Sequence, residues 1–372
     1  MVIWLYLFFV RGNFWQLHED TIDPKPLERW PRVVAVVPAR DEAETIARAV
    51  TSLTRQDYLG EFAIIVVDDH SSDGTADLAR KAAQDSPAAA RVAVHPAAEL
   101  PPGWTGKVWA MNEGIAAAAA RAPEYFWFVD ADIVHAPSTL RSLVFRAEKD
   151  PLDLASLMVL LQAKTFSERL LIPSFLYFFL MLYPPNWVAN PKSRIAAAAG
   201  GCILLRRAAL ERIGGMAAIR NAVIDDCAVA RAVKASGGKI WLGLTKTSMS
   251  LRGYSSFAKV IDLIARVAFT QLRYSFFLLL GTLVGLFVTY LLPWALFLAY
   301  PGEAWLLVDT TVALMAASFL VTVKFYDLSW PWALTLPIAA LFYMYATCVS
   351  AVRYWLGRGG QWKGRVQAPQ KT

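Results

Sequence analysis

The chain has 372 residues, of which 56% are hydrophobic, and its mean hydropathy of +0.38 is well above the average for soluble proteins. This composition excludes a wholly water-soluble chain and indicates that part of the protein lies in a membrane. The net charge of +7 does not indicate nucleic-acid binding, because five basic residues lie in the last twenty positions, where no acidic residue occurs. Basic residues beside a membrane segment suit anionic lipid headgroups, so we expect a membrane partner and no nucleic acid.

Residues 1–30 form the first predicted unit. Residues 1–10 are apolar and Arg11 follows at once, so this run is too short to cross about 30 Å of hydrocarbon. No small-residue cleavage site follows it, which argues against a signal peptide. We therefore expect a membrane anchor or an interfacial helix, although a start codon assigned too far downstream would leave the same short run.

Residues 31–274 form the second predicted unit, in which strand-like and helix-like patterns alternate. Short apolar runs predict strands at residues 33–37, 64–67, 91–94 and 125–129. Helical spacing and turn signals predict helices at residues 41–53, after the Ser-Ser-Asp-Gly turn, and near 138–147. This alternation predicts an α/β fold with a Rossmann-like, mostly parallel sheet and helices on both faces. In such sheets, ligands bind at the edge where the strands end.

Acidic residues follow three of the predicted strands. They are Asp41 and Glu42 after the first strand, Asp68 and Asp69 after the second, and Asp130 and Asp132 after the fourth. A single Asp-x-Asp is a weak motif, because aspartate also caps backbone amides in ordinary turns. Three acidic strand ends on one edge repel each other unless a cation lies between them. The pattern therefore indicates a metal or cationic site.

Two further polar features lie in the same unit. Lys107 follows Gly106 where a loop turns into a helix, a position that can bind a diphosphate or can carry an ordinary solvated lysine. Neither Gly-x-Gly-x-x-Gly after the first strand nor a P-loop motif is present. Asp225 and Asp226 precede a helical run, where the helix dipole alone would favour acidic residues. The three cysteines have no zinc-ligand spacing and indicate reduced thiols.

The apolar stretch at residues 170–183 is too short to span a membrane and ends at two prolines. A buried core helix and an interfacial helix laid on the bilayer both remain open for it. Three longer uncharged or nearly uncharged runs can each cross a membrane, at residues 276–300, 304–323 and 330–352. Residues 275–352 are therefore predicted to be a transmembrane region of about three helices, and residues 353–372 a basic tail.

Six short motifs occur in an order that resembles the family 2 glycosyltransferases with the GT-A fold. They are PARDEAETI at residues 38–46, VVDDHSSDGT at 66–75, GKVWAMNEG at 106–114, DAD at 130–132, AGGCILLRRAALERIGG at 199–215 and IDD at 224–226. Each motif is weak alone, but the ordered set is specific. Among these enzymes, LPPGWTGK, IDDCAVARAVK, TQLRYS and the C-terminal hydrophobic runs most resemble the membrane-bound, hopanoid-biosynthesis-associated glycosyltransferases.

The resemblance implies a role for each motif residue. The residues expected to bind the nucleotide sugar are Pro38, Arg40, Glu42, Asp68, Asp69, Lys107, Asp130 and Arg273. Asp130 and Asp132 are expected to hold a divalent metal, Mg²⁺ or Mn²⁺, since such hard cations take carboxylate and phosphate oxygens. Asp226 matches the position of the general base, which deprotonates an acceptor hydroxyl. The implied donor is a nucleotide sugar, with a UDP-sugar expected.

The implied activity is an inverting, metal-dependent transfer of a single sugar to a membrane lipid, either a hopanoid or a related terpenoid. Processive relatives carry Gln-x-x-Arg-Trp, whereas residues 270–274 read TQLRY, which weakens the case for a polymer. The remaining alternatives are a polysaccharide synthase or polyprenyl-phosphate glycosyltransferase of the same fold, and a catalytically inactive membrane scaffold.

Nucleotide sugars are cytoplasmic, so the implied location is a bacterial-type inner membrane, crossed several times, with the catalytic domain in the cytoplasm. Three spans after that domain would place the basic tail outside, against the positive-inside tendency. Either one hydrophobic run is re-entrant or the tendency is overridden.

Overall fold

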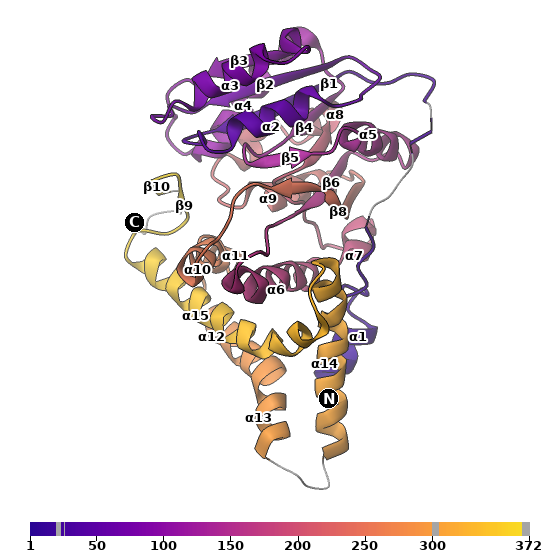
Figure 1. Ribbon diagram of the computed structural model, residues 1–372, viewed down its shortest axis with the longest axis vertical. Helices are drawn as coiled ribbons and strands as arrows, with labels where there is room; N and C mark the ends of the chain where they lie inside the picture. The colour runs from indigo at the N-terminus through magenta and orange to yellow at the C-terminus, as the bar shows by residue number, and fades with distance from the viewer. Residues whose placement is uncertain (20–23, 26, 300–304, 367–372) are drawn as a thin grey trace.

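Four of the strands expected from the sequence form the parallel half of one sheet (Figure 1). The structure is a computed structural model that describes residues 1–19, 24–25, 27–299 and 305–366. The four strands are β1 (Val33–Ala39), β2 (Phe62–Asp68), β3 (Val92–Pro96) and β4 (Tyr125–Phe128). β1 pairs in parallel with both β2 and β4, and β2 pairs in parallel with β3. All seven residues of β1 are buried, as expected for a strand covered on both faces.

The other half of the sheet is mixed. It contains β5 (Ile133–His135), β6 (Leu154–Leu160), β7 (Ile203–Arg206) and β8 (Ile240–Ser250), and the full order is β3-β2-β1-β4-β7-β6-β8-β5. β7 is antiparallel to β4 and β6, and β5 is antiparallel to β8. The predicted α/β sheet is therefore confirmed, with antiparallel strands in the half that the sequence patterns did not resolve.

Helices cover both faces of the sheet (Figure 1). One face packs against α2 (Ile46–Thr54), α3 (Thr75–Gln84) and α5 (Thr139–Lys149), and the other against α4 (Gly106–Ala117), α8 (Arg207–Arg212) and α9 (Asp225–Ala235). Side chains of β1 alternate between the two cores, as the two-residue period of a strand requires. α2 begins later than the predicted residue 41, because Asp41 has a positive φ of 49° that a helix cannot contain.

A long apolar helix, α6 (Phe166–Leu182), lies between the sheet and the remaining helices. α6 begins with a capping box in which Thr165 and Glu168 satisfy each other's backbone N–H groups. It packs against α10 (Phe257–Ala265), α14 (Trp305–Phe325) and α15 (Leu336–Trp355), and most of its side chains are buried. Of the two alternatives for residues 170–183, the structure thus favours the buried helix over one laid bare on the bilayer.

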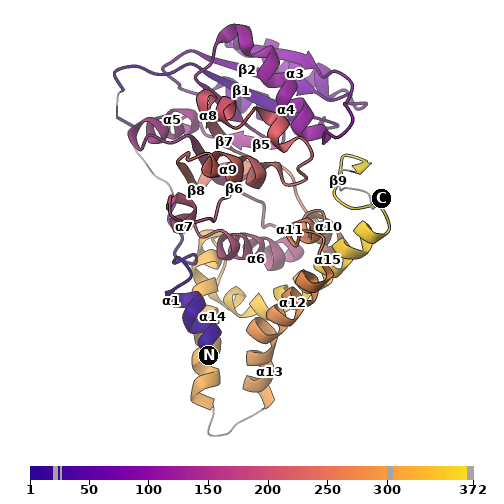
Figure 2. The same cartoon turned by 180° about the vertical axis from the view of Figure 1, so that it is seen from behind.

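Among the described residues, four segments are long and apolar enough to cross a membrane, which indicates a membrane protein. They are Phe166–Ala189, which comprises α6 and α7 (Pro185–Ala189), together with Phe276–Ala299, Leu306–Phe325 and Trp330–Trp355. Only two of them extend far from the sheet: α12 (Phe276–Leu286) leads through a π-helical turn into α13 (Leu292–Ala299), and α14 runs back beside it (Figures 1 and 2). α6 instead lies across the direction of α13 and α14 (Figure 1).

The C-terminal end of the chain returns to the sheet. α15 packs on α10 and α11 (Ala268–Gln271) and leads to a small hairpin of β9 (Gln361–Trp362) and β10 (Arg365–Val366), which lies beside the sheet domain (Figure 2). Because α12–α13 leads away and α14 leads back, the hairpin is on the same side of the extended helices as the sheet. Three full spans after the sheet domain would have placed the tail on the opposite side, and the described hairpin instead lies on the side of the sheet.

The N-terminal helix α1 (Val2–Phe9) packs along α14. Trp4 is buried and donates a hydrogen bond from Nε1 to the Thr289 carbonyl at 2.8 Å. Arg11 donates from Nε to the Met181 carbonyl at 3.0 Å, where it caps the C-terminal end of α6. The helix is too short to cross a membrane alone, and its outer side chains, such as Phe9, are exposed.

Tyr177 tests whether α6 is firmly docked on the extended helices, because its buried hydroxyl lies 2.8 Å from that of Ser318 in α14. Tyr177→Ala is expected to lower the free energy of unfolding by about 3–5 kcal/mol, the range for buried aromatic side chains. Tyr177→Phe should cost about 1 kcal/mol, since it loses one hydrogen bond. Thermal unfolding of the full chain in detergent measures both, with Leu182→Ala at an exposed α6 position as the control. Equal stability of Tyr177→Ala and the control would contradict this packing.

Candidate active site

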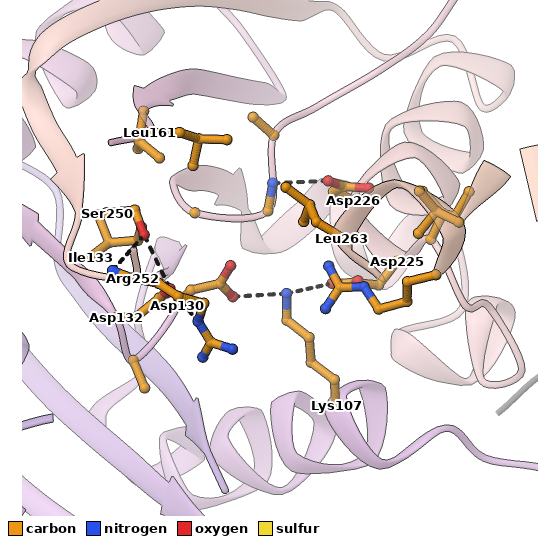
Figure 3. Close-up of a pocket in the computed structure, with 18 of the residues that line it drawn as sticks. Lys107, Asp130, Asp132, Ile133, Leu161, Asp225, Asp226, Ser250, Arg252 and Leu263 are labelled. Atoms are coloured by element: carbon orange, nitrogen blue, oxygen red, sulfur yellow. Dashed lines mark hydrogen bonds and ion pairs between the residues drawn. The ribbon is translucent and has the colours of Figure 1, made fainter. Parts of the chain in front are cut away.

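The ends of β1 and β4 meet the beginnings of α4 and α9 around a cavity of about 280 Å³. Six of the residues singled out in the sequence line it: Pro38, Glu42, Lys107, Asp130, Asp132 and Asp226. They come from segments far apart in the chain, and Figure 3 shows Lys107 and the four labelled aspartates around the same space. The expected convergence of acidic strand ends therefore occurs for β1 and β4.

Lys107 lies at the centre of the cavity (Figure 3). Its Nζ is 2.8 Å from Asp130 Oδ1 and 3.3 Å from Asp225 Oδ2. Burial by itself would lower the pKa of Lys107, but the neighbouring Asp130 and Asp225 carboxylates raise it above its ordinary value. The lysine is therefore a permanent cation and not a solvated side chain. A Cβ at Gly200 would lie only 3.3 Å from Lys107 Nζ, so the absence of a side chain at Gly200 leaves room for the lysine ammonium group.

Asp226 lies in the first turn of α9 and faces the same cavity. Its Oδ2 accepts a hydrogen bond from the Gly200 N–H at 2.9 Å, and its Oδ1 accepts one from the Cys227 N–H at 2.6 Å. Burial, together with the adjacent Asp225 carboxylate, raises the pKa of Asp226 to about 6. A carboxylate held in one orientation with a pKa near neutrality is suited to accept a proton.

Asp130 and Asp132 are each paired with a cation. Arg252, just after β8, places Nε 3.1 Å from Asp132 Oδ2 and Nη2 2.6 Å from Glu42 Oε1. Burial and the charge of Asp130 raise the pKa of Asp132. Burial would also raise the pKa of Asp130, but Lys107 lowers it below its ordinary value. Arg252 was missed in the sequence, where an isolated arginine after a strand carries no distinguishing signal.

The donor atoms at this position suit a divalent metal. Asp130 and Asp132 present carboxylate oxygens to one cavity, and hard cations such as Mg²⁺ and Mn²⁺ prefer such ligands. The described residues contain no group of three or more His, Cys, Asp or Glu side chains arranged to hold a metal ion. The remaining ligands would have to be water and phosphate oxygens, which is the usual way that Mg²⁺ binds beside a nucleotide.

Asp68 and Asp69, at the end of β2, lie outside the cavity lining and have different surroundings. Asp68 Oδ1 is buried and has no hydrogen-bond partner among the described residues. Asp69 is fully buried, and Arg40 donates a hydrogen bond to its carbonyl at 2.6 Å. An orphaned buried acceptor is costly unless a ligand satisfies it, so Asp68 has the free capacity for a ligand N–H, whereas Asp69 is held by the protein.

The C-terminal hairpin docks on these same residues. Arg365 Nη1 lies 2.7 Å from Asp69 Oδ2, while Lys363 Nζ lies 2.9 Å from Glu42 Oε1 and donates to the Asp41 carbonyl at 2.8 Å. Gly360 and Lys363 also line the cavity. Two of the basic residues expected to face lipid headgroups therefore contact acidic residues at the ends of β1 and β2.

Arg273 is not brought to the cavity. It lies in the turn before α12 with a positive φ of 52°, its side chain is exposed, and it lines neither of the two cavities beside the sheet edge. The sequence places it within a recognisable motif, but the turn directs this part of the chain elsewhere.

The sheet domain has a mixed α/β fold with a charged cavity at its strand ends, and it is joined to helices able to span a membrane. These features are those of a GT-A-like domain. Residues 34–214 match the model of glycosyl transferase family 2. This match covers slightly less than half of the chain, and it makes the sheet domain similar to that family.

Solved structures of other proteins resemble the chain, and one of them supports the same fold. A mannosyltransferase from Pyrobaculum calidifontis in complex with GDP-Man and Mn²⁺ is 19% identical with a TM-score of 0.57, and the match covers 94% of this chain and 95% of that one. S. aureus TarS 1-349 in complex with UDP-GlcNAc is 16% identical with a TM-score of 0.42, over 88% of this chain and 92% of that one. The first of these carries the comparison, and it extends over the helices as well as the sheet. None of the curated proteins matches the chain.

The Arg365–Asp69 pair tests whether the hairpin is docked. Arg365→Met leaves the buried Asp69 carboxylate without its nearest cation and should lower the free energy of unfolding by about 1–3 kcal/mol. Adding Asp69→Asn should recover part of that loss, because it removes a buried charge whose remaining arginine partner, Arg40, lies 3.7 Å away. Thermal unfolding measures all three proteins. Arg358→Met is the control, since the described part of the chain gives the Arg358 side chain no partner; equal effects at the two arginines would contradict docking.

Proposed function

We propose that the protein is an inverting, metal-dependent glycosyltransferase that moves a single sugar from a nucleotide sugar to a membrane lipid. The observation that carries the proposal is the composition of the cavity. It is lined by Lys107, Asp130, Asp132 and Asp226, and also by apolar side chains such as those of Phe175, Phe179 and Leu263. Such a cavity can bind a charged donor and an apolar acceptor beside each other.

The apolar side of the cavity supports a lipid acceptor. Phe175 and Phe179 come from α6, and Leu263 and Val267 come from α10 and the residues after it. These helices pack directly against α15, and α6 also packs against α14, so the apolar wall is continuous with segments able to lie in a membrane. A lipid with a rigid, apolar body and a hydroxyl group, such as a hopanoid or related terpenoid, is the acceptor that we propose.

The donor would bind at the edge of the parallel strands. The free Oδ1 of Asp68 can accept a hydrogen bond from the base, for which uracil is our proposal, and Glu42 faces the ribose side of the cavity. Lys107 and the Asp130–Asp132 pair would face the diphosphate. Asp130 and Asp132 would hold a Mg²⁺ or Mn²⁺ ion. When bound, this ion would supply positive charge that stabilises the departing nucleoside diphosphate.

The reaction itself needs one proton acceptor. Asp226 takes the proton of the acceptor hydroxyl, and the acceptor oxygen forms a bond to the anomeric carbon of the sugar. The bond from that carbon to the diphosphate oxygen breaks, and its electron pair leaves with the nucleoside diphosphate. Attack from the face opposite the leaving group inverts the anomeric configuration. Lys107, between Asp130 and α9, keeps the donor and acceptor sides of the cavity together.

We place the catalytic domain on the cytoplasmic side of a bacterial inner membrane, where nucleotide sugars are made. We propose the same side for the described part of the basic tail, because the C-terminal hairpin contacts the sheet edge; this orientation would agree with the positive-inside tendency. A reporter fused after Thr372 that is active only outside the cytoplasm would contradict this orientation.

The function is tested by incubating membranes containing the full chain with a panel of nucleotide sugars and identifying the product by mass spectrometry. A lipid that gains one sugar is the expected product. A long polymer would favour a processive synthase instead. Failure of the purified protein to bind any nucleoside diphosphate with Mn²⁺ would favour a catalytically inactive scaffold.

The pKa of Asp226 predicts the acid limb of the pH profile. Asp226 works as a base only when ionised, so kcat/KM should fall about tenfold per unit as the pH drops below about 6. Asp226→Asn keeps the size of the side chain but cannot accept the proton, and it should lose about 10²–10⁴-fold in turnover. Asp77→Asn, at an exposed position in α3, is the control. Full turnover by Asp226→Asn would show that another group is the base.

The proposed metal pair predicts a metal requirement. A chelator should abolish transfer, and Mn²⁺ or Mg²⁺ should restore it. Loss of a residue that only hydrogen-bonds to a metal ligand typically weakens metal binding by roughly 10–100-fold. Asp132→Asn removes a proposed ligand itself, so it should raise the metal concentration needed for half-maximal rate by at least that factor. The same titration on Asp77→Asn gives the reference value. Transfer that is unaffected by the chelator would exclude a metal from the reaction.

A further inference from the structure

The cationic side chains around the cavity are not equally available to a ligand. Within the described part of the chain, four of them line the cavity: Lys107, Arg252, Arg266 and Lys363. Three of them already form ion pairs. Lys107 pairs with Asp130 and Asp225, while Arg252 and Lys363 both pair with Glu42. The described residues give the Arg266 side chain no hydrogen bond and no ion pair. One guanidinium at the cavity is therefore free for a ligand.

Arg266 is well positioned although its side chain is free. It directly follows α10, and its backbone N–H donates to the Asp262 carbonyl at 3.0 Å, so its main chain is held. Arg266 lines both the cavity and an adjoining groove of about 870 Å³, and Glu42 and Lys363 also line both spaces. Its charge acts on the Asp130 carboxylate across the cavity. Arg266 thus lines the same cavity as Asp130 and Asp132, and it directly follows a helix that packs against α15.

The chemistry of the proposed donor explains why a free arginine would be needed there. A nucleoside diphosphate leaves with more negative charge than it carries in the donor, and the charge of Lys107 is already shared between two carboxylates. A guanidinium can donate two parallel hydrogen bonds to phosphate oxygens, which a single ammonium group cannot do in the same geometry. Arg273, which the sequence motif suggests for this task, lies at neither cavity.

We propose that Arg266, and not Arg273, binds the diphosphate of the donor and stabilises the departing nucleoside diphosphate. The proposal rests on the proposed function, because it assumes a nucleotide-sugar donor. It assigns the diphosphate contact to the residue that follows α10, so the donor would be held between the sheet edge and a helix that also forms the apolar acceptor wall. Donor and acceptor binding would therefore depend on the same helix.

The test measures binding by the purified full chain in detergent with Mn²⁺. The ligands are UDP and GDP, each compared with its nucleoside, uridine or guanosine. Arg266→Ala should weaken binding of the preferred nucleoside diphosphate by about 10- to 100-fold, the value of a charge-assisted hydrogen bond or two. It should leave binding of the nucleoside unchanged, because only the phosphate contact is removed. Arg266→Lys should restore part of the loss, since it keeps the charge without the two parallel donors.

Two further variants complete the test. Arg273→Ala should bind the nucleoside diphosphate with the same affinity as the unchanged protein. Lys259→Ala is the matched control for removal of a cation, because Lys259 lies in α10 and lines only the adjoining groove. A loss in Arg273→Ala that equals or exceeds the loss in Arg266→Ala would overturn the inference, and so would an unchanged affinity in Arg266→Ala. If the unchanged protein bound neither UDP nor GDP, this result would contradict the proposed function and therefore also the inference about Arg266.

Discussion

The buried ammonium group of Lys107 is the interaction on which the candidate active site depends. It lies between a carboxylate after β4 and a carboxylate at the start of α9, at 2.8 and 3.3 Å. Without a cation between them, these acidic groups would repel each other strongly in a partly buried cavity. Lys107 allows them to approach, and Gly200 leaves the space that the approach needs. Three separate segments are thereby held at one point.

The same site is continuous with the part of the protein that is suited to a membrane. One hydrophobic core extends from the sheet face under α4 and α9, through α6, to side chains of α14 and α15. Because protein interiors are closely packed, this core fixes the position of α6 and α10 relative to Lys107 and Asp226. The apolar side chains that line the cavity are therefore held in place by the packing between the sheet and the helices.

The C-terminal segment changes the interpretation of the basic tail. The excess of positive charge near the end of the chain suggests lipid headgroups, but Lys363 and Arg365 pair with Glu42 and with the fully buried Asp69. A buried carboxylate gains much more from such a pair than an exposed one does. These two charges thus serve the sheet edge, and the path of α12–α13 and α14 makes this possible by bringing the chain back to its starting side.

The sequence by itself determined the parallel strands, the acidic residues at their ends, and the roles expected of Lys107, Asp130, Asp132 and Asp226. These features depend on local periodicity and on motif order, which are visible without coordinates. Only the tertiary structure decided the partners of these residues. Arg252 reaches Glu42 across 210 positions, and Lys363 reaches the Asp41 carbonyl across 322. It also placed Arg266, and not Arg273, in the lining of the cavity. An isolated basic residue has no local pattern that distinguishes it from a solvated one, so its role depends on what the fold places opposite it.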